Sequence, residues 1–168
     1  MPETATKPVY LVDAESDPVV VRIDGRACFQ NSTCLRDFVI EMIKRGKTRF
    51  VLDFEHCVSM DSTFLGVLAG TALELRRSAP GASVTLIRVG PRNLDLIRNL
   101  GLHRLLKIET GDTKPAFCDT ALECQPKSEL ETAKDVLEAH ENLVKADATN
   151  SGKFQDVLAF LRNRVEQK

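Results

Sequence analysis

Strand-like and helix-like patterns alternate through the middle of the chain, and this alternation restricts the possible folds more than any other feature. Residues 49–54 and 83–89 are short apolar runs typical of buried strands, and residues 105–108 resemble a last short strand. Residues 61–78 and 91–101 have the apolar spacing, start signals and stop signals of helices. Because strands separated by helices pair in parallel through right-handed crossovers, the sequence predicts an α/β fold.

The first part of the chain adds an antiparallel component. Residues 9–12 and 19–23 have strand patterns, and the cluster at residues 15–18 between them is typical of a hairpin turn. Residues 35–43 carry apolar side chains at helical spacing, and the helix is expected to stop near Gly46. We therefore expect a mixed β-sheet flanked by amphipathic helices.

The C-terminal part is expected to be wholly helical. The chain has 168 residues, of which 43% are hydrophobic, so it can bury one core and carry a short appendage. The sequence predicts a domain over residues 1–112, a linker over 113–126 and a helical hairpin over 127–168. Ser128 and Glu131 form a capping-box pattern at the start of the hairpin.

Two roles for this αα-hairpin remain open. Its apolar stripes could cover an exposed face of the domain's own sheet, or they could mediate dimerisation or partner docking. A unit of this size buries too little apolar surface to offset the conformational entropy lost when it folds. We therefore expect the hairpin to pack against the domain or against a second copy of the chain.

Charge and cysteine usage exclude several classes of protein. The 23 basic and 24 acidic residues are mixed along the chain, which argues against binding nucleic acid or a membrane surface through bulk charge. The first residues have no signal-peptide pattern, and no stretch is long enough to span a bilayer, so we expect a cytoplasmic protein without membrane insertion. The five cysteines are predicted to be reduced thiols, because their odd number and spacing favour neither a disulfide framework nor a metal site (Cys28, Cys34, Cys57, Cys118 and Cys124).

The segment over residues 51–68 carries the most information about function. A buried strand leads through a short loop to Asp61 and Ser62, which are expected at the N-terminus of a helix. Either side chain can cap the amide groups there, and the positive end of the helix dipole tolerates an added anion. Ser62 is therefore either a helix cap or an accessible hydroxyl suited to phosphorylation.

Asp61-Ser62-Thr63, followed by Leu65-Gly66-Val67-Leu68 after the strand, resembles the signature of the STAS-domain family, and specifically that of bacterial anti-sigma-factor antagonists. The resemblance covers about residues 9–108. It implies that Ser62 is phosphorylated by an anti-sigma-factor-like serine kinase and restored by a matching phosphatase, with Thr63 as the fallback acceptor. It also implies a partner-switching regulator of signal transduction and transcription that does not catalyse a reaction.

This sequence departs from the family pattern at Phe64, where the family usually has glycine. Phe64 could turn inward as core, or point outward as an anchor for a particular partner. Asp61, Ser62, Thr63 and Phe64 are the predicted partner-binding residues. A second hypothesis keeps the domain but not the phosphorylation, as a STAS scaffold or accessory subunit of a larger complex such as a lipid transporter.

An enzymatic reading has little support in the sequence. Ser62 lacks the glycine-flanked nucleophile elbow, and the three histidines have no metal-binding spacing. His140 lies on an apolar helical stripe, where a hydrogen-bonded, half-buried histidine is commoner than a ligand. We therefore expect no catalytic residues, no metal and no cofactor. The expected partners are the kinase, the phosphatase and a second copy of the chain that forms a homodimer through the C-terminal helices.

Overall fold

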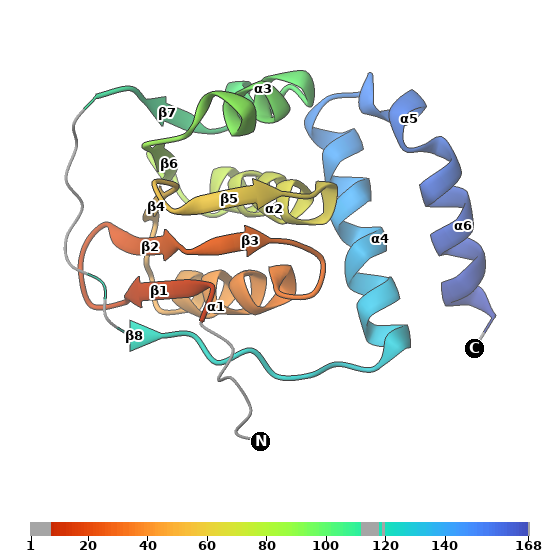
Figure 1. Ribbon diagram of the computed structural model, residues 1–168, viewed down its shortest axis with the longest axis horizontal. Helices are drawn as coiled ribbons and strands as arrows, with labels where there is room; N and C mark the ends of the chain where they lie inside the picture. The colour runs from red at the N-terminus through yellow and green to blue at the C-terminus, as the bar shows by residue number, and fades with distance from the viewer. Residues whose placement is uncertain (1–7, 112–117, 119, 168) are drawn as a thin grey trace.

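The computed structural model describes residues 8–111, 118 and 120–167. Its main sheet has six strands in the order β7-β6-β4-β2-β1-β8 (Figure 1). Strand β1 pairs antiparallel with β2 and β8, whereas the β2-β4, β4-β6 and β6-β7 pairs are parallel. The sheet is therefore mixed, as predicted. Its strands are β1 (Tyr10–Asp13), β2 (Val19–Ile23), β4 (Arg49–Asp53), β6 (Ser83–Ile87), β7 (Lys107–Glu109) and β8 (Thr120–Ala121).

The apolar stripes predicted for the first helices face the core. Helices α1 (Ser32–Lys44) and α2 (Ser62–Ser78) lie next to each other on the same side of the sheet, behind it in Figure 1. Helix α3 (Pro91–Asn99) begins with proline and is followed by a short 3₁₀ helix (Leu102–Arg104). The core cluster joins strand side chains such as Phe50 and Leu86 to helix side chains such as Leu35 and Leu68. The predicted α/β fold with flanking helices is confirmed.

A small second sheet was not predicted. Strands β3 (Gly25–Ala27) and β5 (Cys57–Met60) pair in parallel with a register shift near Gly25. Their sequences predict a turn and a loop, because strands of three and four residues are too short to show a periodic pattern. Strand β5 leads directly into α2, so this sheet positions the start of that helix.

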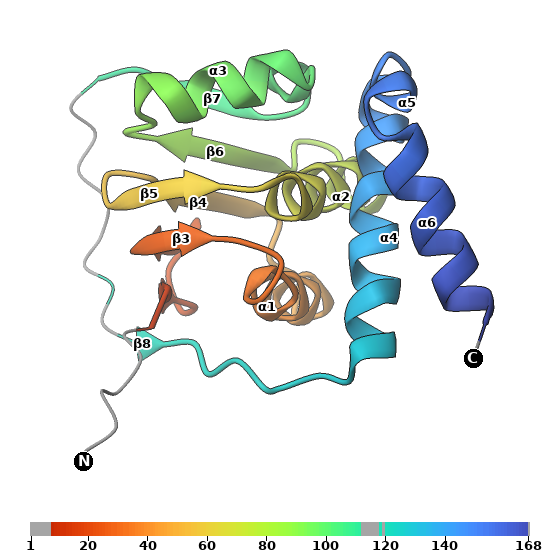
Figure 2. The same cartoon turned by 45° about the vertical axis from the view of Figure 1, so that its right-hand side comes forward.

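The C-terminal segment forms a helical hairpin that docks on the domain. Helix α4 (Glu129–Ala146) packs against α2, and α6 (Gln155–Glu166) packs on the outer side of α4 (Figure 2). The capping box at Ser128 and Glu131 is present. The short helix α5 (Asn150–Lys153) connects the two long helices.

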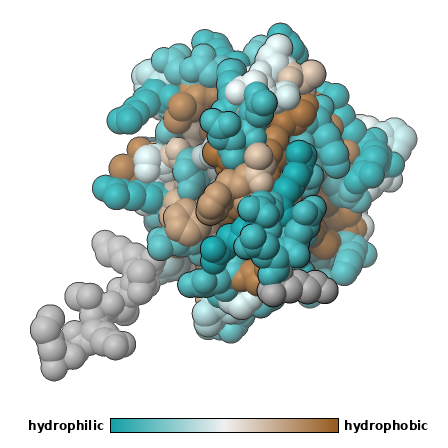
Figure 3. Space-filling view, turned by 90° about the vertical axis from the view of Figure 1, so that its right-hand side faces the viewer, coloured by the Kyte–Doolittle hydropathy of each residue, from teal (hydrophilic) through white to brown (hydrophobic). Residues whose placement is uncertain are grey.

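The suggestion that the hairpin covers a free face of the sheet is wrong. Its apolar stripe lies on α2, which already covers the sheet, so the hairpin adds a further layer of helix. Figure 3 faces this layer and shows hydrophobic residues among polar ones. On α6, the side chain of Phe160 is 65% exposed.

The described part of the segment predicted as a linker makes two structural contributions. Residues 113–117 and 119 lie outside the described residues, but β8 extends the main sheet, and Cys124 forms a disulfide with Cys34 of α1. The Cα atoms of the two cysteines are 5.1 Å apart. The prediction of reduced thiols is therefore wrong for this pair. Its members are 90 residues apart in sequence, so spacing gave no indication of the bond.

None of the helices formed by the described residues is both long enough and apolar enough to cross a membrane.

Candidate functional site

Asp61 holds the start of α2 with both oxygens of its carboxylate. Its backbone is extended, and Oδ1 accepts a hydrogen bond from the Phe64 amide at 2.9 Å. Oδ2 accepts a hydrogen bond from the Phe29 amide at 2.7 Å. The carboxylate thus caps the helix and ties it to the loop that precedes α1, so the position of Ser62 is defined by two separate segments.

Ser62 is the first residue of α2, and its hydroxyl contacts the C-terminal hairpin. Ser62 Oγ lies 2.8 Å from Nε2 of His140 on α4. Nδ1 of the same ring lies 2.7 Å from the Val136 carbonyl oxygen. Because a carbonyl can only accept, Nδ1 carries a proton, and in the neutral ring Nε2 accepts the hydrogen bond from the Ser62 hydroxyl.

His140 is itself held in a closed environment. Its residue exposure is 3%, and its ring meets Phe154 edge to face with centroids 5.1 Å apart. The interpretation of His140 as a hydrogen-bonded histidine rather than a metal ligand agrees with these contacts. Its partner Ser62 was not predicted, because the two residues lie 78 positions apart and belong to different predicted units.

Thr63 and Phe64 face inward. Phe64 is fully buried and packs edge to face against Phe54 with ring centroids 6.3 Å apart. The inward alternative for Phe64 is confirmed, and its place among the predicted partner-binding residues is corrected because it offers no surface. Thr63, the fallback acceptor, is also buried. Of the four predicted residues, Asp61 and Ser62 are the ones with accessible surface.

A pocket of about 440 Å³ opens beside Ser62. Its walls are mostly apolar and include Leu65 of α2, Leu96 of α3 and Phe154 at the start of α6. Lys153 also lines it, with Nζ donating to the Asn99 carbonyl oxygen at 2.5 Å. The Ser62 hydroxyl therefore lies between a buried imidazole and a recess with one ammonium group.

Phe29 is a surface residue at this site that was not predicted from the sequence. Its side chain is 47% exposed, and its amide is bonded to Asp61. An exposed aromatic residue is a common anchor in protein interfaces. The only sequence signal was an aromatic residue in a predicted loop, which does not indicate proximity to Asp61.

Two buried ionisable groups near the site, Cys57 and Tyr10, have raised pKa values. Burial raises the pKa of the Cys57 thiol to about 11. Burial also raises the pKa of the Tyr10 phenol, with smaller effects from Cys28, Cys57 and Asp61. The Tyr10 hydroxyl donates to Asn31 Oδ1 at 2.8 Å. Across the described residues, no group of three or more acidic, histidine or cysteine side chains could hold a metal ion.

Comparison with known proteins places this architecture in a family. The model of the family described as "Mlab, STAS domain" matches residues 10–107. The search of curated proteins gave no significant match.

Three solved structures share the fold. SpoIIAA, an anti-sigma factor antagonist, in its unphosphorylated form has a TM-score of 0.51 at 18% identity, with 61% of this chain and 88% of that chain covered. Bacillus SpoIIAA in its phosphorylated form has a TM-score of 0.50 at 21% identity, with 60% and 91% covered. TM1081 of Thermotoga maritima, assigned as an anti-sigma factor antagonist, has a TM-score of 0.50 at 20% identity, with 62% and 87% covered.

The family match and the mixed sheet with its flanking helices agree over the same part of the chain, and the C-terminal hairpin lies outside the matched residues. The chain belongs to the STAS-domain family.

Proposed function

We propose that this protein is a partner-switching regulator of the anti-sigma-factor-antagonist kind, controlled by phosphorylation of Ser62. The observation that carries the proposal is the position of the Ser62 hydroxyl in the first turn of α2, next to the capping carboxylate of Asp61. A phosphate there would add about −1.5 to −2 charges to the surface that includes Asp61 and Phe29. SpoIIAA, which shares the fold, has been solved in phosphorylated and unphosphorylated forms, which supports this kind of control.

The proposed partners follow from this mode of control. The unmodified chain binds an anti-sigma-factor-like serine kinase in the cytoplasm, and a matching phosphatase restores the hydroxyl. The protein itself acts by binding and does not catalyse a reaction. A homodimer through the C-terminal helices is also part of the proposal, and the exposed Phe160 of α6 supports it.

Phosphorylation by kinases encoded in the same genome tests this function. Each candidate is incubated with the full chain, and mass spectrometry locates the phosphate, with Ser62→Ala as the matched control. We expect phosphate on Ser62 and none on the control. In a binding assay with the active kinase at low salt, Ser62→Ala should bind and Ser62→Asp should bind more weakly, because only the aspartate adds charge. Absence of phosphate on Ser62 with every such kinase would contradict the proposal.

A second candidate function is a STAS scaffold or accessory subunit of a larger complex that is not phosphorylated, such as a lipid transporter. The hydrogen bond between Ser62 and His140 favours it, because the hydroxyl already has an internal partner. The two functions differ in the genes expected beside this one. Neighbouring kinase and phosphatase genes favour the switch, and neighbouring transporter subunits favour the scaffold.

A further inference from the structure

We propose that the C-terminal hairpin (α4–α6) is a removable cover on α2, held over Ser62 by His140, and that a kinase reaches Ser62 after this cover opens. The inference rests on the proposed function for the identity of the visiting protein. The contact of the hairpin with Ser62 is a property of the structure, since Ser62 Oγ and His140 Nε2 are 2.8 Å apart. Four observations support a cover that can open.

The surface of α2 is shaped to receive α4. A Cβ atom at Gly66 would lie 2.2 Å from the backbone carbonyl oxygen of Ala139, and a Cβ at Gly70 would lie 2.4 Å from Nδ2 of Asn142. These two glycines are one turn apart on the helix face that begins with Ser62. A side chain at Gly66 would hold α4 away because it meets backbone, whereas one at Gly70 would displace the Asn142 side chain. The face that carries Ser62 is therefore a binding surface for a closely approaching helix.

The hairpin contributes few large apolar side chains to the domain. Among the described residues of α4–α6, Leu143 alone belongs to the main core cluster, and Ala146 packs against its edge, as does Phe154 between α5 and α6. The residues of α4 that lie against the Ser62 face of α2 include a small one, Ala139, and the polar side chains of His140 and Asn142. Segments with few buried apolar contacts open at a lower free energy than the global unfolding of the protein.

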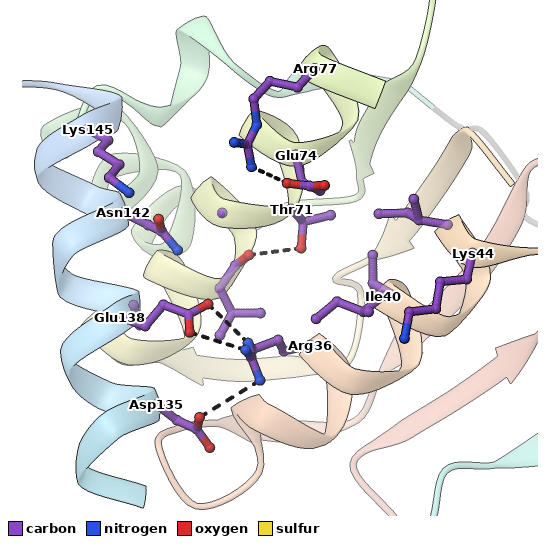
Figure 4. Close-up of a pocket in the computed structure, with 15 residues that line it drawn as sticks. Arg36, Ile40, Lys44, Thr71, Glu74, Arg77, Asp135, Glu138, Asn142 and Lys145 are labelled. Atoms are coloured by element: carbon purple, nitrogen blue, oxygen red, sulfur yellow. Dashed lines mark hydrogen bonds and ion pairs between the residues drawn. The ribbon is translucent and has the colours of Figure 1, made fainter. Parts of the chain in front are cut away.

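Beside the contact between α4 and α2, the surface that α4 shares with α1 is charged and contains a pocket. Figure 4 shows a pocket between α1, α2 and α4, with Arg36 of α1 pointing toward Glu138 and Asp135 of α4. Its volume is about 420 Å³. The Arg36 and Glu138 atoms are 3.1 to 3.2 Å apart, but Glu138 is half exposed, so this ion pair stabilises closure only weakly.

Phosphorylation and the closed cover exclude each other. The Ser62 hydroxyl gives its proton to the hydrogen bond with His140, and a phosphate ester would remove that proton. No phosphoryl group fits between two atoms 2.8 Å apart. The phosphorylated chain therefore cannot keep this hydrogen bond, and the phosphate would hold the hairpin in its open state.

Native-state hydrogen exchange on the full chain tests the cover without any kinase. We expect the amides of α4 and α6 to exchange faster than those of β4 and β6, because the hairpin opens while the sheet stays folded. Gly66→Ala should increase exchange in the hairpin by about tenfold or more, because the new methyl group meets backbone. It should leave β4 and β6 protected, because alanine strengthens α2 itself.

Gly70→Ala is the matched control, since its methyl group meets the end of a flexible side chain and should change exchange much less. His140→Ala, which deletes the contact with Ser62, should increase hairpin exchange by about fivefold. The proposal of a removable cover is contradicted if the hairpin and the sheet exchange at one common rate in the wild type and in both the Gly66 and His140 variants. A hairpin that opens in a chain that no kinase phosphorylates would instead contradict the proposed function alone.

Discussion

Arg88 neutralises the negative charge of a carboxylate that has no access to water. Asp53, at the end of β4, is fully buried, and both of its oxygens accept from the Arg88 guanidinium at the end of β6. The hydrogen bond to Asp53 raises the pKa of Arg88, and Glu55 adds a second ion pair. The backbone of Arg88 is left-handed, with φ of 55°, a conformation that costs energy for any residue with a Cβ.

Arg88→Met should therefore destabilise the protein more than an ordinary charge deletion. It removes the only ion pair of the buried Asp53 among the described residues and leaves its carboxylate with the Glu55 amide as hydrogen-bond donor. We expect a loss of about 3 kcal/mol in the free energy of unfolding. The matched control is Arg22→Met, whose pair with Asp24 is about one-third exposed and should cost less than about 1 kcal/mol. Urea denaturation measures both variants, and equal midpoints for the two would show that the Asp53 pair has no special weight.

Some roles of single residues could be predicted from the sequence and others could not. Asp61 and Ser62 could be placed at a helix start because cap preferences act over three or four residues. The inward turn of Phe64 was one of two open alternatives, and burial in the core decided it. The contact between Ser62 and His140 could not be predicted, because no local rule relates residues that only tertiary packing brings together.

The carboxylate of Asp61 makes two hydrogen bonds that stabilise the N-terminus of α2. Asp61 accepts from the amide of Phe64 in its own helix and from the amide of Phe29 in a separate loop. Charge-assisted bonds of this type also benefit from the helix dipole. The element that carries Ser62 is therefore stabilised by the residue next to it.

Asp61→Ala should remove both hydrogen bonds and lower the free energy of unfolding by about 1 to 2 kcal/mol. Asp61→Asn keeps one acceptor oxygen and should lose less. Chemical denaturation gives the stability, and hydrogen exchange at the Phe29 and Phe64 amides locates the change. The prediction fails if the alanine variant is as stable as the asparagine variant, because the acceptor oxygen that asparagine keeps would then contribute nothing.

At the scale of elements, long periodic segments were predictable and short or docked ones were not. The bounds of α2 and of β2 follow from apolar spacing and end signals that are visible in the sequence. Strands β3 and β5 are too short for a period. The stripe on α4 indicated that the helix needed a partner, but the partner face on α2 is formed by Gly66 and Gly70, whose small size leaves no hydrophobic signal.

At the scale of the whole molecule, a disulfide joins the domain to the segment that leads into the hairpin. Cys34 lies on α1, and Cys124 lies a few residues before the start of α4. The bond closes a loop of 90 residues and restrains the hairpin at its N-terminal end. A loop of this length removes substantial conformational entropy from the unfolded chain.

Reduction of the Cys34–Cys124 bond should therefore lower the stability of the full chain by about 2 to 4 kcal/mol. The loss should be largest for α4–α6, because the reduced hairpin has lost its restraint to α1. Guanidinium denaturation with and without dithiothreitol measures the total loss, and hydrogen exchange shows its distribution. Cys34→Ser should reproduce the reduced state, whereas Cys28→Ser should not, because Cys28 is outside the bond. Identical unfolding with and without reductant, or no peptide pair linked through Cys34 and Cys124 under non-reducing conditions, would show that the hairpin is held by noncovalent packing alone.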